Sequence, residues 1–130
     1  GSVGCETADY LAPLINDLFP TNRDITLIEM TNGLMTGESG ATKSLLTRRM
    51  MEKGVKIELN SKITYVDETT IKYEKNNQEY VLDDVDTLVF AVGYQPISSP
   101  IENAHLIGDC QKVGTLKDAI SQAYQITKEI

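Results

Sequence analysis

The stretch Gly1-Ser2-Val3-Gly4-Cys5-Glu6-Thr7-Ala8 decides the fold that we expect for this chain. It leads into apolar residues that recur at helical spacing, which predicts a helix over about residues 4–18, with Pro13 as a kink or an early end. Glycines at the start of such a helix let the backbone approach a pyrophosphate, which then lies against the helix N-terminus. We therefore interpret Gly1, Ser2, Val3 and Gly4 as the end of a glycine fingerprint for a dinucleotide, although Gly1-Ser2 is also what a cloning scar leaves.

The next element supports a nucleotide site. Ile25 to Glu29 is a short apolar run that ends in an acid, and it predicts a buried strand. An acid at this place accepts hydrogen bonds from a ribose 2′-hydroxyl, so Glu29 is a candidate ribose ligand; an ordinary strand-end acid explains it equally well. A second helix over about residues 41–52, ended by Gly54, and a strand over residues 55–59 follow.

The remaining sequence predicts mainly strands. Residues 62–66, 70–74 and 80–82 are rich in β-formers and predict an antiparallel meander. Residues 86–93 predict the most buried strand, and a further strand over 104–107 precedes a helix over about 116–130. This order of elements predicts an α/β, Rossmann-like three-layer nucleotide-binding domain with a mainly parallel sheet plus an antiparallel β-meander. Such sheets bind nucleotides at the carboxyl ends of their strands.

The composition argues against several kinds of partner. With 12 basic and 19 acidic residues the net charge is −7, which disfavours nucleic acid and anionic membranes. No apolar run reaches the roughly 20 residues that span a bilayer. The two cysteines lie far apart and there is one histidine, so we expect no metal site, no redox cysteine pair and a reducing, cytoplasmic setting.

Four segments come in the order found in two-dinucleotide flavoprotein reductases. They are Gly4 to Ala8, Ile25 to Glu29, Asp86 to Pro96 and Leu106 to Asp109. Over nearly its whole length the chain resembles the carboxyl-terminal FAD/NAD(P)-binding region of the NADH:flavin oxidoreductase and NADH oxidase family related to 2,4-dienoyl-CoA reductase and enoate reductase. The resemblance implies that residues 1–96 are an NAD(P)H-binding domain. It implies that residues 97–130 are a connector and the C-terminal strand–helix piece of the FAD domain.

The resemblance also implies roles for single residues. Gly93 lies in the crossing between the two domains. Gly108 and Asp109 resemble the segment whose aspartate holds the FAD ribityl chain, although within these residues alone a helix cap or turn is the simpler role for Asp109. Leu116 starts the helix whose N-terminus points at the flavin ring. Glu6 would lie near the nicotinamide, although an acid that favours a helix start is the simpler explanation. No catalytic side chain is implied, because hydride transfer between two cofactors needs positioning alone.

The cofactors follow from the same resemblance. We expect NADH rather than NADPH, because a 2′-phosphate would be repelled by Glu29 and no arginine directly follows to receive it. FAD is expected in the full-length enzyme. FMN and an iron–sulfur cluster are expected outside these residues, and they would pass electrons on to an unsaturated substrate. We expect the isolated chain to be inactive and to hold no flavin, because the first FAD fingerprint is absent from it.

One departure from the family concerns the sheet. The strand that precedes the fingerprint is absent, and buried backbone groups left unpaired cost about 1–3 kcal/mol each. We expect residues 104–107 to fill the vacant position, from the same chain or by exchange with a neighbour in a homo-oligomer. The alternative is a native first strand upstream of Gly1.

Other classes stay open beside the oxidoreductase. A non-catalytic Rossmann-like nucleotide-binding domain and an interaction domain are the main alternatives. A disulfide reductase would need a cysteine pair close in the sequence, which the chain lacks. Several reactive residue types have simple structural interpretations: Cys5 and Cys110 as small packing residues, His105 as structural, and Arg48, Arg49 and Lys53 as a solvated helix face.

Overall fold

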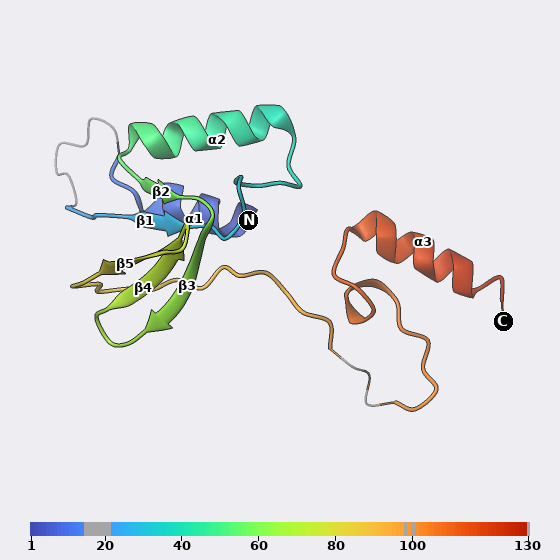
Figure 1. Ribbon diagram of the computed structural model, residues 1–130. Helices are drawn as coiled ribbons and strands as arrows, with labels where there is room; N and C mark the ends of the chain where they lie inside the picture. Colours follow the sequence, from blue (N-terminus) through green and yellow to red (C-terminus); the bar gives the residue numbers. More distant parts are fainter. Residues whose placement is uncertain (15–21, 98, 100, 130) are drawn as a thin grey trace. The chain divides into compact units, whose positions relative to one another are not determined.

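The computed structural model describes residues 1–14, 22–97, 99 and 101–129. The chain divides into two compact units, Gly1–Val92 and Gly93–Ile130. The first unit contains α1 (Ser2–Leu11), β1 (Thr26–Ile28), α2 (Gly40–Glu52), β2 (Lys56–Glu58), β3 (Ser61–Val66), β4 (Ile71–Lys75) and β5 (Gln78–Leu82) (Figure 1). The second contains the 3₁₀ turn η1 (Gly108–Cys110) and α3 (Leu116–Ile126).

A parallel pair of strands lies at the centre of the first unit. β1 pairs with β2 in parallel, with Leu27 opposite Ile57. The connection between them is α2, which begins after the N-cap Ser39, whose side chain accepts from Thr42 N. It ends where Gly54 takes a φ of +82°, a left-handed conformation that glycine adopts without strain. The predicted helix over 41–52 and the strand inside 55–59 are therefore confirmed.

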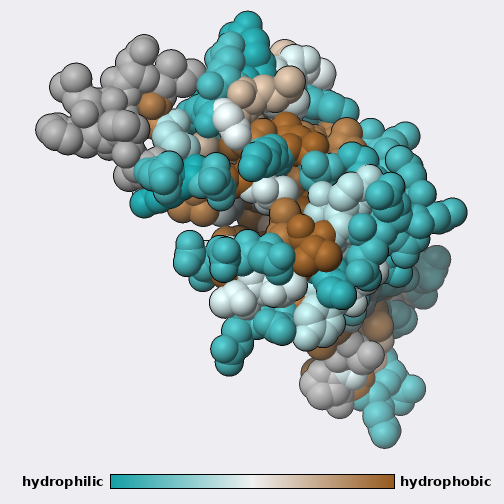
Figure 2. All heavy atoms as spheres, turned by 60° about the vertical axis from the view of Figure 1, so that its left-hand side comes forward, coloured by the Kyte–Doolittle hydropathy of each residue, from teal (hydrophilic) through white to brown (hydrophobic). Residues whose placement is uncertain are grey.

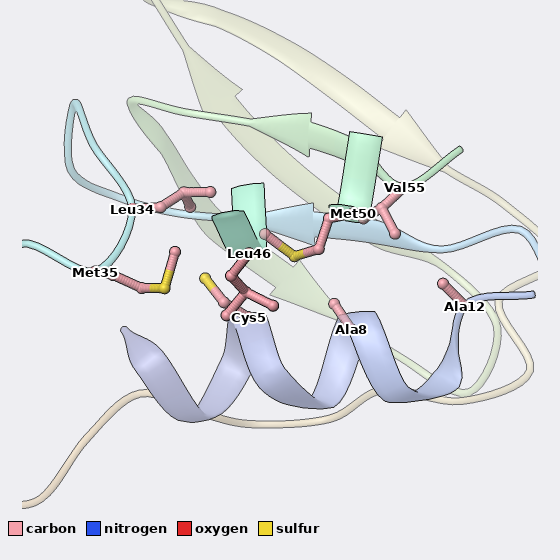
Figure 3. Packing of buried hydrophobic residues seen from close by; sticks show 8 residues of the cluster. All are labelled: Cys5, Ala8, Ala12, Leu34, Met35, Leu46, Met50 and Val55. Atoms are coloured by element: carbon pink, nitrogen blue, oxygen red, sulfur yellow. The ribbon is translucent and has the colours of Figure 1, made fainter. Parts of the chain in front are cut away.

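The core of this unit lies between α1, α2 and the parallel strands. Figure 3 shows Cys5 and Ala8 on the face of α1 that is turned toward Leu46 and Met50 of α2, and Ala12 directly after the end of α1. Small side chains on α1 let the two helices approach closely. The buried set is completed by residues from the loops and by partly buried residues of the strand region: Leu34, Met35, Val55, Ile25, Leu27, Ile57 and Leu59. Helix α1 is shorter than predicted, and residues 15–18 of that prediction lie outside the described residues.

The predicted antiparallel meander is confirmed. Its strands follow the order β3-β4-β5. Asn76 and Asn77 form the two-residue turn between β4 and β5 with φ of 53° and 60°, which suits the twist of a tight hairpin. Tyr73 stacks on its cross-strand partner Tyr80, with ring centroids 5.3 Å apart. Hydrophilic residues cover much of the face seen in Figure 2, with hydrophobic residues exposed between them.

Two predicted strands are wrong. Residues 86–93 form no ladder, and Phe90 and Val92 are 67% and 89% exposed. Residues 104–107 form no ladder either, so the expected filling of the sheet from the same chain does not occur. A strand exists only where a neighbour supplies hydrogen bonds, and among the described residues β1 pairs with β2 alone. The result is a mixed α/β arrangement with a small parallel sheet and a separate antiparallel one.

Candidate functional site

The start of α1 meets the end of β1. The Gly1 nitrogen donates to Oε2 of Glu29 at 3.0 Å. Beside it the Ser2 hydroxyl donates to Oε1 of Glu38 at 2.7 Å. No side chain caps the start of α1 among the described residues, whereas Ser39 caps α2. The structure thus brings together the glycine-rich start and the strand-end acid that the sequence singled out.

Glu29 is held as an anion. Thr31 donates to its Oε1 twice, from the backbone nitrogen and from the hydroxyl, each at 2.9 Å. Burial by itself raises the pKa of Glu29, since its side chain is only 16% exposed. The hydrogen bonds from the Thr31 amide, the Gly1 nitrogen and the Thr31 hydroxyl outweigh burial and hold the pKa below its ordinary value. The carboxylate therefore stays a hydrogen-bond acceptor throughout the neutral range.

A loop between β1 and α2 frames the acid. The Thr31 hydroxyl also lies 2.9 Å from the Gly33 carbonyl oxygen. Lys43 Nζ lies beside Gly33, 3.6 Å from where a Cβ would stand. Sequence reasoning missed Thr31, Glu38 and Lys43. A signal existed for Thr31, because a threonine two residues after an acid commonly hydrogen-bonds locally.

Gly4 has a packing role. A Cβ at this position would lie 3.3 Å from the Cβ of Ala91, which is tighter than ordinary van der Waals contact. The glycine therefore lets the segment after the meander pass close to α1. Val3 is 61% exposed and Glu6 is exposed, so neither is committed to the core.

The basic face of α2 differs in part from the expectation. Arg48 is exposed and, within the described part of the chain, forms an ion pair with Glu52 alone, as a solvated helix residue would. Arg49 and Lys53 instead bind the buried Asp9 of α1. The hydrogen bond from Arg49 is the main reason why the pKa of Asp9 lies below its ordinary value, and Lys53 adds to it against the cost of burial. This cluster lines a hollow at the C-terminal ends of the two helices with Tyr10, Leu14 and Arg23.

The second unit holds the other candidate residues. Asp109 Oδ1 accepts from Gly114 N at 3.1 Å, which is a turn-stabilising role. Gly108 has a φ of +58° and packs against Ala119 of α3. Helix α3 begins with a capping box between Thr115 and Asp118, and Leu116 is 78% exposed. Gly93, with a φ of +86°, is the first residue of this unit.

The thiols and other ligand types form no redox or metal centre in the described part of the chain. Cys5 is a buried free thiol whose pKa is raised, chiefly by burial, and Cys110 is an exposed free thiol. No group of three or more His, Cys, Asp or Glu side chains could hold a metal ion within the described ranges. No helix in those ranges is long and apolar enough to cross a membrane.

A helix N-terminus beside a strand-end acid, on a mixed α/β scaffold, is the arrangement of nucleotide-binding domains. Residues 1–123 match the family of pyridine nucleotide-disulphide oxidoreductases, and the chain belongs to this family. It is therefore an oxidoreductase domain of a family that uses a pyridine nucleotide. The description of this family includes disulphide oxidoreductases. The sequence had argued against a disulfide reductase, because the chain has no two cysteines close together.

Two curated relatives match the whole chain. A cinnamate reductase of Clostridium sporogenes is 27% identical over 140 residues, which cover 100% of this chain and 20% of that protein. An NADH oxidase of Thermoanaerobacter brockii is 21% identical with the same coverage. The chain thus spans about a fifth of the length of these relatives.

A solved structure shares the fold. The HOCl-induced flavoprotein disulfide reductase RclA from Escherichia coli superposes with a TM-score of 0.57 at 16% identity, covering 100% of this chain and 34% of that one. At this identity the likeness is evidence for the fold alone.

Proposed function

We propose that this chain is the pyridine-nucleotide-binding segment of a flavin-dependent oxidoreductase related to 2,4-dienoyl-CoA reductase and enoate reductase. In this proposal it binds NADH so that a hydride can pass to FAD. The observation that carries it is the contact between the start of α1 and Glu29. Residues 1–96 form the NADH-binding domain, and residues 97–130 belong to the FAD domain.

The residues at the start of α1 fit a dinucleotide. The first-turn amides of Ser2, Val3 and Gly4 are the natural donors to a pyrophosphate, because the unpaired amides of a helix N-terminus attract anions. Glu29, ionised and partly exposed, is an acceptor for the hydroxyls of the adenosine ribose. Glu6, exposed on the second turn, would lie on the nicotinamide side. The bound nucleotide supplies the hydride, while the protein binds and orients it.

The same carboxylate favours NADH over NADPH. A 2′-phosphate beside Glu29 would meet a like charge in a partly buried place, where repulsion is weakly screened. Glu38 adds a second negative charge near the start of α1. Lys43 lies beside the loop, but one ammonium does not offset two carboxylates, and it lacks the planar fork with which arginine grips phosphate.

The second unit is assigned to FAD in the full-length enzyme. Asp109 would hold the ribityl chain, Gly108 and Leu116 would flank it, and Gly93 would let the chain cross between domains. Onward transfer through an iron–sulfur cluster and FMN to an unsaturated substrate is part of the proposal for the full-length protein. The name of the cinnamate reductase, whose substrate is an unsaturated acid, supports that class of substrate.

Exchange of residues 104–107 between two copies also stays part of the proposal. In the described residues β1 has a strand on one edge only, which leaves room for a strand from outside the chain. Light scattering on the purified chain checks it: a dimer is expected, and a monomer at all concentrations contradicts the exchange.

Calorimetric titration tests the function. The purified chain should bind NADH more tightly than NADPH. Absence of NADH binding, equal affinities or a preference for NADPH would overturn the proposal. Binding of NADH with no transfer to a flavin in the full-length enzyme would favour the non-catalytic nucleotide-binding alternative.

A further inference from the structure

Thr31 holds one oxygen of Glu29 from two directions. Its backbone nitrogen and its hydroxyl both reach Oε1, each at 2.9 Å. The hydroxyl has a single proton and also lies near the Gly33 carbonyl, so it donates to one acceptor at a time. The carboxylate is the stronger acceptor, because a charged partner roughly doubles the strength of a hydrogen bond.

This arrangement fixes the direction of the carboxylate. With Oε1 held by Thr31, Oε2 is turned toward the Gly1 nitrogen at the start of α1. A carboxylate offers about four lone-pair sites. Acceptor capacity therefore remains on Oε2, on the side where the proposed ribose would lie.

Packing does not explain Thr31. The residue is exposed and does not belong to the buried cluster, whose loop members are Leu34 and Met35. Its methyl group buries little, so exchange of its hydroxyl for a methyl leaves no cavity. Its contacts through the side chain are polar ones within the loop.

We propose that Thr31 is a positioning residue for cofactor choice: its hydroxyl aims the Glu29 carboxylate at the adenosine ribose and so sets the preference for NADH. The proposal rests on the proposed function, since it concerns the same site. It goes further in assigning selectivity to a pair of residues, of which only one touches the cofactor.

The test compares three variants by calorimetry with NADH and NADPH. Thr31→Val keeps the shape and the backbone donor but removes the hydroxyl, and Thr31→Ser keeps the hydroxyl. Thr36→Val is the matched control, because it makes the same change at another exposed position of the loop. Thr31→Val should lower the affinity for NADH by roughly threefold to tenfold, as the loss of one hydrogen bond does. NADPH should change less, and Thr31→Ser and Thr36→Val should stay within about twofold of the unchanged chain.

A pH series separates positioning from a merely structural role. Burial and the remaining donors still act on Glu29 in Thr31→Val, but one bond that lowers its pKa is gone. The acid-side loss of NAD⁺ binding should therefore move to higher pH in Thr31→Val and stay in place in Thr36→Val.

The outcomes distinguish the two levels of the account. If the unchanged chain binds NADH and Thr31→Val keeps its affinity, its cofactor ratio and its pH profile, the role of Thr31 is refuted while the proposed function stands. If the unchanged chain binds neither cofactor, both the proposed function and the role of Thr31 are refuted. Thermal unfolding of each variant shows whether a lost affinity reflects a lost fold, and in that case recovery of binding by Thr31→Ser supports the hydroxyl's role while its failure refutes it.

Discussion

The Gly1 nitrogen and Oε2 of Glu29 are 3.0 Å apart, although 28 positions separate them in the sequence. The contact places the acid that ends β1 at the start of α1. Parallel β1–β2 pairing supports the position of Glu29, because its backbone nitrogen donates to the Glu58 carbonyl at 2.8 Å, one residue beyond the strand. The start of α1 and the end of β1 are therefore joined by a polar contact.

The pH dependence of nucleotide binding should follow Glu29. Its pKa lies below the ordinary glutamate value, so the carboxylate accepts hydrogen bonds above that range and loses them only as the pH falls through the lowered pKa. Affinity for NAD⁺, which tolerates acid better than NADH, should stay constant from pH 7 to about pH 5 and fall below it. Calorimetry at each pH measures this. Glu29→Gln should bind weakly with no acid-side fall; a fall of the same size in that variant would show that another group is responsible.

Asp9 should be a major source of stability in the first unit. Its side chain is 10% exposed and faces Arg49 and Lys53, of which Lys53 is itself only 9% exposed. Asp9→Asn leaves a buried ammonium without its counter-charge, which should lower the free energy of unfolding by on the order of 3 kcal/mol. Urea unfolding measures the change. Arg48→Gln, which breaks an exposed helix pair, should cost at most about 0.5 kcal/mol.

The same ion pairs give stability a pH dependence. The pKa of Asp9 is lowered in the folded chain, chiefly by the bond from Arg49. Its contribution is present above the ordinary aspartate pKa and is lost as the pH falls through the lowered value. The unchanged chain should therefore lose more stability than Asp9→Asn between about pH 5 and pH 2. Parallel stability curves for the two would contradict this assignment.

Substitution at Gly4 should depend on side-chain size. A Cβ there would meet Ala91 at 3.3 Å, but residues 86–92 are held by no ladder and can shift by a few tenths of an ångström. Gly4→Ala should therefore keep or raise stability, by up to about 1 kcal/mol from helix propensity. Gly4→Val should lower it by about 1–3 kcal/mol through overpacking. Urea unfolding measures these changes, with Gly37→Ala as a control. A loss of stability in Gly4→Ala would show that the contact between Gly4 and Ala91 is rigid.

The sequence predicted the local elements better than the sheet. Helix α2 and the meander are marked by local sequence signals, such as Gly54 at the helix end and Asn76-Asn77 at the hairpin turn. These signals were sufficient to predict both elements. The expected strand over 86–93 was apolar enough, but apolar character does not supply a neighbouring strand. For the candidate site, Glu29 and the glycine-rich start followed from local pattern. Thr31, Glu38 and Lys43 did not, because their places depend on how the loop after β1 folds back.

The most direct test of the account is the change in cofactor ratio caused by Glu29→Ala. Glu52→Ala, at the far end of α2, is the control for loss of an acid. Glu29→Ala should weaken the binding of NADH by at least about tenfold, since it removes hydrogen bonds to a charged acceptor, while NADPH should bind as before or more tightly. Equal weakening of both cofactors, or unchanged affinity for NADH, would contradict the placement of the adenosine ribose at Glu29.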